Sequence, residues 1–197
     1  MEFRIDVVGG KAAVYTPYYP DFIDKIKRKT GKWDAGQGAW IIEASAIDAV
    51  RKAMREEYGR DDQSVGETVR VRLTFLDSWY EDKGPVALLG RILSRAYSRD
   101  GGGKAGEGVI YINGRPSSGG SKNNWRSIVP KGSVIELPNI PKALVEGYEI
   151  EGVEIEIMPE TFIDVEALRA ERERCAARIA EIDAMLNDAV PNGENAE

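Results

Sequence analysis

Apolar and polar side chains alternate at the beginning of the chain and then change to a helical spacing. The alternation in residues 3–7, followed by a glycine turn and a second extended run, predicts a β-hairpin. Residues 20–30 carry apolar side chains three and four positions apart, and this spacing returns in residues 46–58 after two strand-like segments within residues 33–42. Residues 1–60 therefore predict a small ββαββα module.

The helical spacing disappears after a polar segment, residues 61–67, which we interpret as a linker. Alternating and β-branched runs such as VRVRLTF and WRSIV then predict a β-rich domain over residues 68–158. Within it we expect residues 85–97 to form one strand that is broken or bulged at Gly90. The segment DSWYED, residues 77–82, is expected to be a turn.

Two Gly-rich segments of the β-rich domain are predicted to be loops. Residues 98–108 contain the string GGGKAG, which has the letters of a dinucleotide-binding fingerprint. That fingerprint requires a helix after the glycines, and a strand-like GVIYI follows here, so we reject it and expect a flexible hairpin tip. Residues 113–124 form the second loop. In both loops basic residues stand among small residues, whose side chains cover the backbone N–H groups only slightly. Such backbone N–H groups and the basic side chains would suit contact with phosphates.

The last part of the chain, residues 159–188, is predicted to be an amphipathic or coiled helix. Its seam positions repeat with spacing 3-4 from Val165 to Leu186, as in a coiled coil, and all are apolar except Arg172, which costs stability in a two-stranded seam. We expect either a homodimer through residues 164–187 or packing of the same stripe on the chain's own sheet. Residues 189–197 are predicted to be disordered. The whole pattern predicts an α+β protein.

The composition argues against several kinds of catalytic and metal-binding site, but it does not identify a function. The 197 residues include no histidine, so the commonest general base and metal ligand are missing. The one cysteine, Cys175, lies on the predicted apolar seam and is expected to be a small buried hydrophobe. The carboxylates near Asp77 and Asp82 lack the spacing of a calcium loop. We therefore expect no enzymatic activity, no cofactor and no metal.

Charge is distributed unevenly around a net value of −6. Residues 85–132 contain eight Lys and Arg against two Asp and Glu, whereas residues 133–197 contain five against 16. Arg91 and Arg95 should share one face of their predicted strand, with Arg99 continuing that line. The loops add further cations, and the hairpins would form one basic patch if they were neighbours. Such a patch indicates either a nucleic-acid contact or an ordinary solvated surface.

One aromatic residue and a second group of cations complete the set of candidates. Trp125 stands beside Arg126 and is either a stacking platform for bases or a core residue. Lysines also gather at the end of the first predicted helix, where they contact DNA or compensate the helix dipole. The candidate nucleic-acid-binding residues are Lys27, Lys29, Lys32, Arg99, Lys104, Arg115, Lys122, Trp125 and Arg126.

The order of aromatic and basic residues in the first sixty positions resembles the HARP motif, a small module attached to annealing helicases and found in other DNA-transaction proteins. The matching residues are Pro17, Tyr18, Phe22, Ile26, Lys27, Trp33, Asp34 and Trp40. The resemblance implies interaction with single-stranded or forked DNA, sometimes through partner proteins. It also implies a hairpin between two helices, for which Trp33 and Trp40 would both be core anchors.

These observations favour a non-enzymatic protein of a phage or another mobile element that binds single-stranded or forked DNA through basic loops. An alternative partner is a DNA-binding host protein, with the acidic C-terminal part inhibiting a host Cas nuclease as an anti-CRISPR would. A third reading is an assembly protein that oligomerises through its C-terminal helix. No apolar run is long enough to span a membrane and no leader pattern follows Met1, so we expect a cytoplasmic protein.

Overall fold

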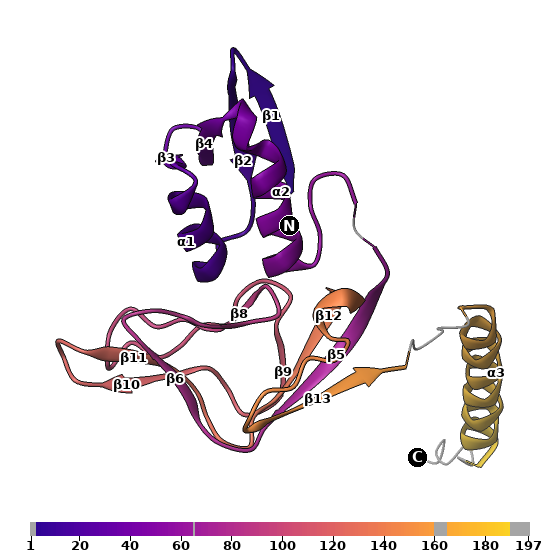
Figure 1. Ribbon diagram of the computed structural model, residues 1–197. Coiled ribbons are helices and arrows are strands. Elements are labelled where there is room, and N and C mark those ends of the chain that lie inside the picture. Colours follow the sequence, from indigo (N-terminus) through magenta and orange to yellow (C-terminus); the bar gives the residue numbers. More distant parts are fainter. Residues whose placement is uncertain (1–2, 65, 160–164, 190–197) are drawn as a thin grey trace. The chain divides into compact units, whose positions relative to one another are not determined.

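A computed structural model describes residues 3–64, 66–159 and 165–189 of the chain. It divides into two compact units, residues 1–159 and 160–197. The first unit contains both small helices and all the strands of Figure 1, and the second contains the helix α3. The α+β architecture predicted from the hydrophobic pattern is confirmed.

The first part of the large unit has the predicted ββαββα order. Its elements are β1 (Arg4–Val8), β2 (Lys11–Tyr15), α1 (Pro20–Arg28), β3 (Lys32–Asp34), β4 (Ala39–Glu43), a 3₁₀ turn η1 (Ala44–Ala46) and α2 (Ile47–Tyr58). The strands form one antiparallel sheet in the order β1-β2-β4-β3, which makes β1 and β3 its edges. We call residues 1–60 the N-terminal module.

One face of this sheet packs against α1 and α2. Phe22 and Ile26, one turn apart on α1, are fully buried, as are Val50 and Met54 at the same spacing on α2. This is the expected outcome for residues four positions apart on a helix, since their side chains lie on the same face. They join side chains of β2 and β4 in one hydrophobic cluster, which is the core of the N-terminal module.

Residues 68–158, which we call the β-rich part, contain nine strands in the described chain. They are β5 (Thr68–Phe75), β6 (Trp79–Asp82), β7 (Val86–Leu88), β8 (Arg91–Ser94), β9 (Ile110–Asn113), β10 (Ser117–Gly120), β11 (Trp125–Val129), β12 (Val134–Pro141) and β13 (Val153–Met158), with a 3₁₀ turn η2 (Lys142–Leu144). The sheet orders are β13-β5-β12-β9, β10-β11-β6 and β7-β8. Figure 1 shows β13, β5 and β12 side by side. A second hydrophobic cluster forms their core.

The interruption expected at Gly90 is present, but the structure corrects the expectation that residues 85–97 are one strand broken or bulged there. Leu89 and Gly90 both have positive φ, +49° and +69°, and the chain reverses there to form the β7–β8 hairpin. Two consecutive residues with positive φ are the signature of a two-residue turn whose twist matches that of the strands. Leucine rarely adopts this conformation, so the residue types at this position did not indicate a reversal.

Three further expectations about loops are wrong. Residues 79–82 form a strand, β6, because they pair with β11, and the predicted loop at residues 113–124 contains β10. The glycines of GGGKAG do not form a free hairpin tip. A Cβ at Gly103 would lie 2.6 Å from the backbone nitrogen of Ser117, and one at Gly106 would lie 2.7 Å from the Ile92 carbonyl oxygen. These glycines permit close backbone packing on β8 and β10.

The N-terminal module and the β-rich part contact one another. Gly59 ends α2 with a φ of +66°, and a Cβ there would lie 2.6 Å from Cβ of Pro141. The β7–β8 turn also packs on α2, since a Cβ at Gly90 would lie 3.3 Å from the Tyr58 ring. The segment predicted as a linker is fixed to α2 at its start, where Arg51 donates two hydrogen bonds, of 2.8 and 2.9 Å, to Asp62.

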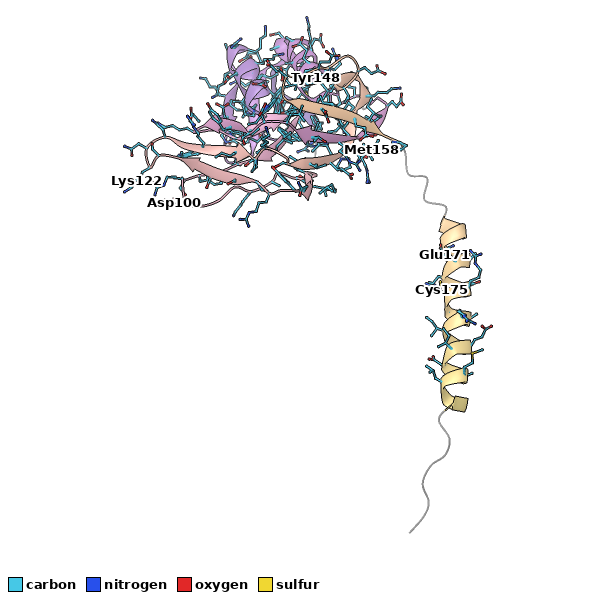
Figure 2. The ribbon with its side chains drawn as sticks, turned by 90° about the horizontal axis from the view of Figure 1, so that it is seen from below. Asp100, Lys122, Tyr148, Met158, Glu171 and Cys175 are labelled. Atoms are coloured by element: carbon cyan, nitrogen blue, oxygen red, sulfur yellow. The ribbon has the colours of Figure 1, made fainter. Side chains whose placement is uncertain are left out.

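The second unit contains α3 (Val165–Ala189). Between Arg169 and Leu186 its side chains are exposed, including Cys175, which projects from the helix surface in Figure 2. The expectation that Cys175 is buried is therefore wrong for this helix by itself. Ala189 is the last residue of α3, and the rest of the tail predicted at residues 189–197 lies outside the described residues. In the described chain no helix combines the length and hydrophobicity needed to cross a membrane.

Candidate nucleic-acid interface

Trp33 and Trp40 face each other across the β3–β4 hairpin. The carboxylate of Asp34 accepts backbone hydrogen bonds from Gly36 and Gln37, at 2.8 and 3.1 Å, and closes the turn between the strands. The register pairs Trp33 with Trp40, and their ring centroids are 5.5 Å apart in an edge-to-face arrangement. Both rings therefore lie on the same face of the sheet.

The expectation that both tryptophans are core anchors holds for Trp40 and is wrong for Trp33. Trp40 is 9% exposed, because β4 has a neighbouring strand on each side. Trp33 lies on the edge strand β3 and is 55% exposed. Its ring is thus a large aromatic surface open to solvent, which the molecule has not used for its own core.

The exposed ring of Trp33 forms one wall of a hollow of about 520 Å³. Tyr18, which is 49% exposed, also lines this hollow, as does Lys27 from the last turn of α1. The other lining residues are Thr16, Pro17, Ile23 and Trp40. Two accessible aromatic rings and one amino group therefore share a cavity of the size of a small-molecule site.

Arg95 of the β-rich part extends this surface beyond the hollow. Its guanidinium carbon lies 4.0 Å from the ring centroid of Tyr18 and 6.0 Å from that of Tyr97, which is 71% exposed. Arg95 also exchanges backbone hydrogen bonds of 2.9 and 2.8 Å with Lys104. Residues paired in this way present their side chains on the same face, so Lys104 belongs to the same surface as Arg95.

We call this surface the aromatic–cation strip, consisting of Tyr18, Lys27, Trp33, Arg95, Tyr97 and Lys104. Both Lys27 and Lys104 are exposed. In the described part of the chain, none of its three cations forms an ion pair with a carboxylate. Their positive charges are therefore available to a ligand. The strip combines aromatic faces with free cations, as surfaces that bind single-stranded nucleic acid do.

The structure separates the remaining lysines of the N-terminal module. Lys29 lines a different hollow, between α1 and α2, where the neighbouring Lys25 is bound to Glu56 and Glu57 at 2.5 and 2.6 Å. Lys32 is paired with Ile41 in the register, so it lies on the opposite face of the sheet from Trp33. It lines a third hollow, of about 610 Å³. The predicted lysines thus do not converge on one surface.

Two of the predicted arginines are neutralised by neighbouring carboxylates. Arg126 donates a hydrogen bond of 2.7 Å to Asp82 and lies over the ring of Tyr80. This bond raises the pKa of Arg126. Arg99 is bound in the same way to Asp100, at 2.8 Å, and its pKa is also raised. These pairs lower the positive potential that the sequence suggested for this region.

The other predicted residues of the β-rich part are spread over its turns. Arg115 and Lys122 are exposed, in the segment before β10 and in the turn after it. Figure 2 shows Lys122 at the same extremity of the large unit as Asp100. Trp125 is half-buried on β11, so it is neither a fully open platform nor a core residue. Of the predicted residues, only Lys27 and Lys104 belong to the aromatic–cation strip.

The sequence contained one signal for the residues that were missed. Arg95 and Tyr97 are two positions apart at the end of an extended segment, which favours a shared face. The stacking of Arg95 on Tyr18 could not be anticipated, because 77 residues separate them in the sequence. Within the described residues, no three His, Cys, Asp or Glu side chains are grouped so that they could hold a metal ion.

Comparisons of the chain with protein-family models, with curated proteins and with solved structures found no match. Its function is therefore inferred from its own geometry.

Proposed function

We propose that this protein is a non-enzymatic DNA-binding protein that binds single-stranded DNA, including the single-stranded arms of forks, along the aromatic–cation strip. The observation that carries the proposal is the alternation of exposed aromatic rings with cations that have no carboxylate partner. Bases of a single strand are free to stack on such rings, while the cations accompany the phosphates.

The geometry favours single strands over duplex DNA. A stacking platform needs an unpaired base with an accessible face, and the bases of a duplex are already stacked on one another. Trp33 and Tyr18 line a concave hollow, which a base can enter and a rigid duplex cannot. Sequence preference is expected to be low, because every base has an aromatic face and the strip carries no paired amide groups that would read base edges.

The proposal is tested by fluorescence anisotropy with a labelled single strand, a duplex of the same sequence and a fork. The single strand and the fork should bind more tightly than the duplex, and affinity should fall with salt. Arg95→Gln should weaken binding, since it removes the cation beside two aromatic rings. Lys131→Gln is a matched control, because Lys131 is bound to Asp77 at 3.3 Å outside the strip.

Two results would contradict the proposal. One is the absence of binding at low salt, after which inhibition of a DNA-binding host protein becomes the better hypothesis. The other is equal loss of affinity in Arg95→Gln and Lys131→Gln, which would indicate a diffuse charge effect without a defined site.

We further propose that α3 pairs with α3 of a second copy to form a parallel homodimer through residues 164–187. The large side chains Ile179, Ile182, Met185 and Leu186 are all exposed on the single helix. Ile179, Ile182 and Leu186 continue the 3-4 spacing of the seam, so a second helix would cover them together. In a parallel pair Arg178 meets Asp183 of the other copy, and these charges are opposite.

A further inference from the structure

A second hollow, of about 420 Å³, lies where the N-terminal module meets the β-rich part. The module contributes Phe3, Tyr58 and Arg60 to its lining. The β-rich part contributes Thr68, Arg91, Glu107, Gly108, Pro138, Asn139 and Pro141. None of these residues belongs to the aromatic–cation strip, so the hollow is a separate feature of the same unit.

Arg60 is placed in this hollow without a compensating partner. Its guanidinium lies 4.5 Å from the ring centroid of Phe3, which holds it by a cation–π contact. In the described part of the chain its Nε is buried and has no hydrogen-bond partner, and the side chain forms no ion pair. A half-buried guanidinium without a carboxylate partner is stabilised by an anion bound beside it.

Arg91 brings a second guanidinium to the same hollow from β8. Its Nη2 donates to the carbonyl oxygen of Asn139, at 3.4 Å. Burial lowers the pKa of Arg91, the carboxylate of Glu107 acts in the opposite direction, and the charge of Arg60 adds to the lowering. Both guanidiniums line the same hollow, so their like charges act on each other. Two guanidiniums against the single carboxylate of Glu107 leave the hollow with a net positive charge.

The strand β12 leaves room for these groups by an irregularity. Its pairing with β5 shifts between Leu137 and Ile140, and Asn139 takes a positive φ of 55°. Pro138, Asn139 and Pro141 line the hollow at this bulge, and the two prolines have no N–H to be satisfied. Apolar surface from the prolines and Phe3 thus stands next to the two arginines.

We propose that this hollow binds a phosphomonoester that carries an aromatic base, either a free nucleoside monophosphate or the phosphorylated end of a DNA strand. Arg60 and Arg91 bind the phosphate, because guanidinium groups match its oxygens in geometry and charge. A volume of about 420 Å³ exceeds the need of a bare phosphate and falls within the range of small-molecule sites. Phe3 and the prolines provide the apolar wall for the organic part.

The probe for this site is adenosine monophosphate, titrated calorimetrically into the full chain. Adenosine and inorganic phosphate are titrated in parallel, and each should bind at least about tenfold more weakly, since each lacks one half of the interaction. Arg60→Gln should weaken binding of adenosine monophosphate by about tenfold or more, as expected for loss of a charged hydrogen bond. Lys131→Gln removes a cation that is bound to Asp77 outside the hollow, and it should change nothing. Thermal melting of each variant verifies folding.

Glu107→Gln supplies a second, opposite test. Removal of this carboxylate should strengthen binding of the phosphate, whereas local loosening of the structure would weaken it. Titration of 5′-phosphorylated and 5′-hydroxyl oligonucleotides then separates the two sources of the phosphate. A preference for the phosphorylated strand that Arg60→Gln abolishes indicates a strand end, and binding of the mononucleotide without that preference indicates a free nucleotide.

The proposed site is refuted if adenosine binds as tightly as its monophosphate, or if Arg60→Gln binds adenosine monophosphate as tightly as the wild type does. It also fails if none of the phosphate-bearing probes binds. This outcome is distinguishable from failure of the aromatic–cation strip, because Trp33→Ala should lose affinity for single strands and keep that for adenosine monophosphate.

Discussion

Replacement of Trp33 by alanine tests the aromatic–cation strip most directly, because the ring is large and more than half exposed. Stacking of one base on an aromatic side chain contributes about 1–3 kcal/mol, which corresponds to about 5- to 150-fold in the dissociation constant. We therefore expect Trp33→Ala to bind a single strand at least about fivefold more weakly than the wild type does.

The same substitution should leave the fold intact. Truncation of a fully buried tryptophan costs about 3–5 kcal/mol, and roughly half of that is expected here because the side chain is 55% exposed. A unit of this size is typically stable by about 10 kcal/mol, so Trp33→Ala remains folded at 25 °C. Trp40→Ala, which empties a buried site, should approach the full cost and serves as the contrasting variant.

A salt series separates stacking from charge. The strip has three cations, so the logarithm of the association constant for a single strand should fall with the logarithm of salt concentration with a slope of about −2. Trp33→Ala should lower affinity at every salt concentration and keep that slope. Lys27→Gln should make the slope shallower by about 0.7, since one phosphate contact is lost. A folded Trp33→Ala that binds like the wild type would refute the reasoning.

Two further predictions concern the second unit and the stability of the first. Sedimentation of the intact chain at tens of micromolar, roughly the range of weak association, should show a dimer that Ile179→Asp dissociates, and a wild-type monomer would contradict pairing through α3. The hydrogen bonds from Arg51 hold the pKa of Asp62 below its usual value. A carboxyl whose pKa is lower in the folded state stabilises the fold above its unfolded pKa, and this contribution disappears as the pH falls through the folded value. In urea titrations Asp62→Asn should therefore cost on the order of 1.5 kcal/mol at pH 7 and progressively less below about pH 4, whereas an equal cost at pH 7 and pH 3 would contradict it.

The local sequence pattern was sufficient to predict the helices and strands of the N-terminal module. It did not predict which side chains are exposed where exposure depends on the position of a strand in the sheet. Alternation and helical spacing predicted the hairpins and both helices, because a buried face imposes its period on the sequence. Trp33 and Trp40 have the same residue type and equivalent places on a hairpin. What distinguishes them is that β3 is an edge strand and β4 is not, and this follows from the strand order, which a local pattern does not contain.

The turn at Leu89-Gly90 shows a different limit. Gly90 indicated that the strand is interrupted. Because glycine is favoured both at a β-bulge and in a two-residue turn, it could not show which of the two is present. The reversal requires a positive φ at Leu89 too, and the fold accepts that strain because the turn packs against Tyr58 of the N-terminal module. A tertiary contact therefore overrides the local preference of a leucine, and it also determines the course of the segment that continues to Arg95.

Net charge by segment was a poor guide to the interface because folding brings carboxylates from one segment to the cations of another. Arg126 is bound to Asp82 and Lys131 to Asp77, and both acids precede the segment that looked basic in the sequence. Among the described residues Arg95 and Lys104 have no carboxylate partner, and Arg95 lies over Tyr18, a residue of the N-terminal module. The strip is thus assembled from both parts of the large unit, and the resemblance to the HARP motif, confined to the first sixty residues, covers only Tyr18, Lys27 and Trp33 of it. For this reason the proposed interaction with single strands would require the assembled unit, and the arginine that joins its two parts should matter as much as the tryptophan that the motif shares.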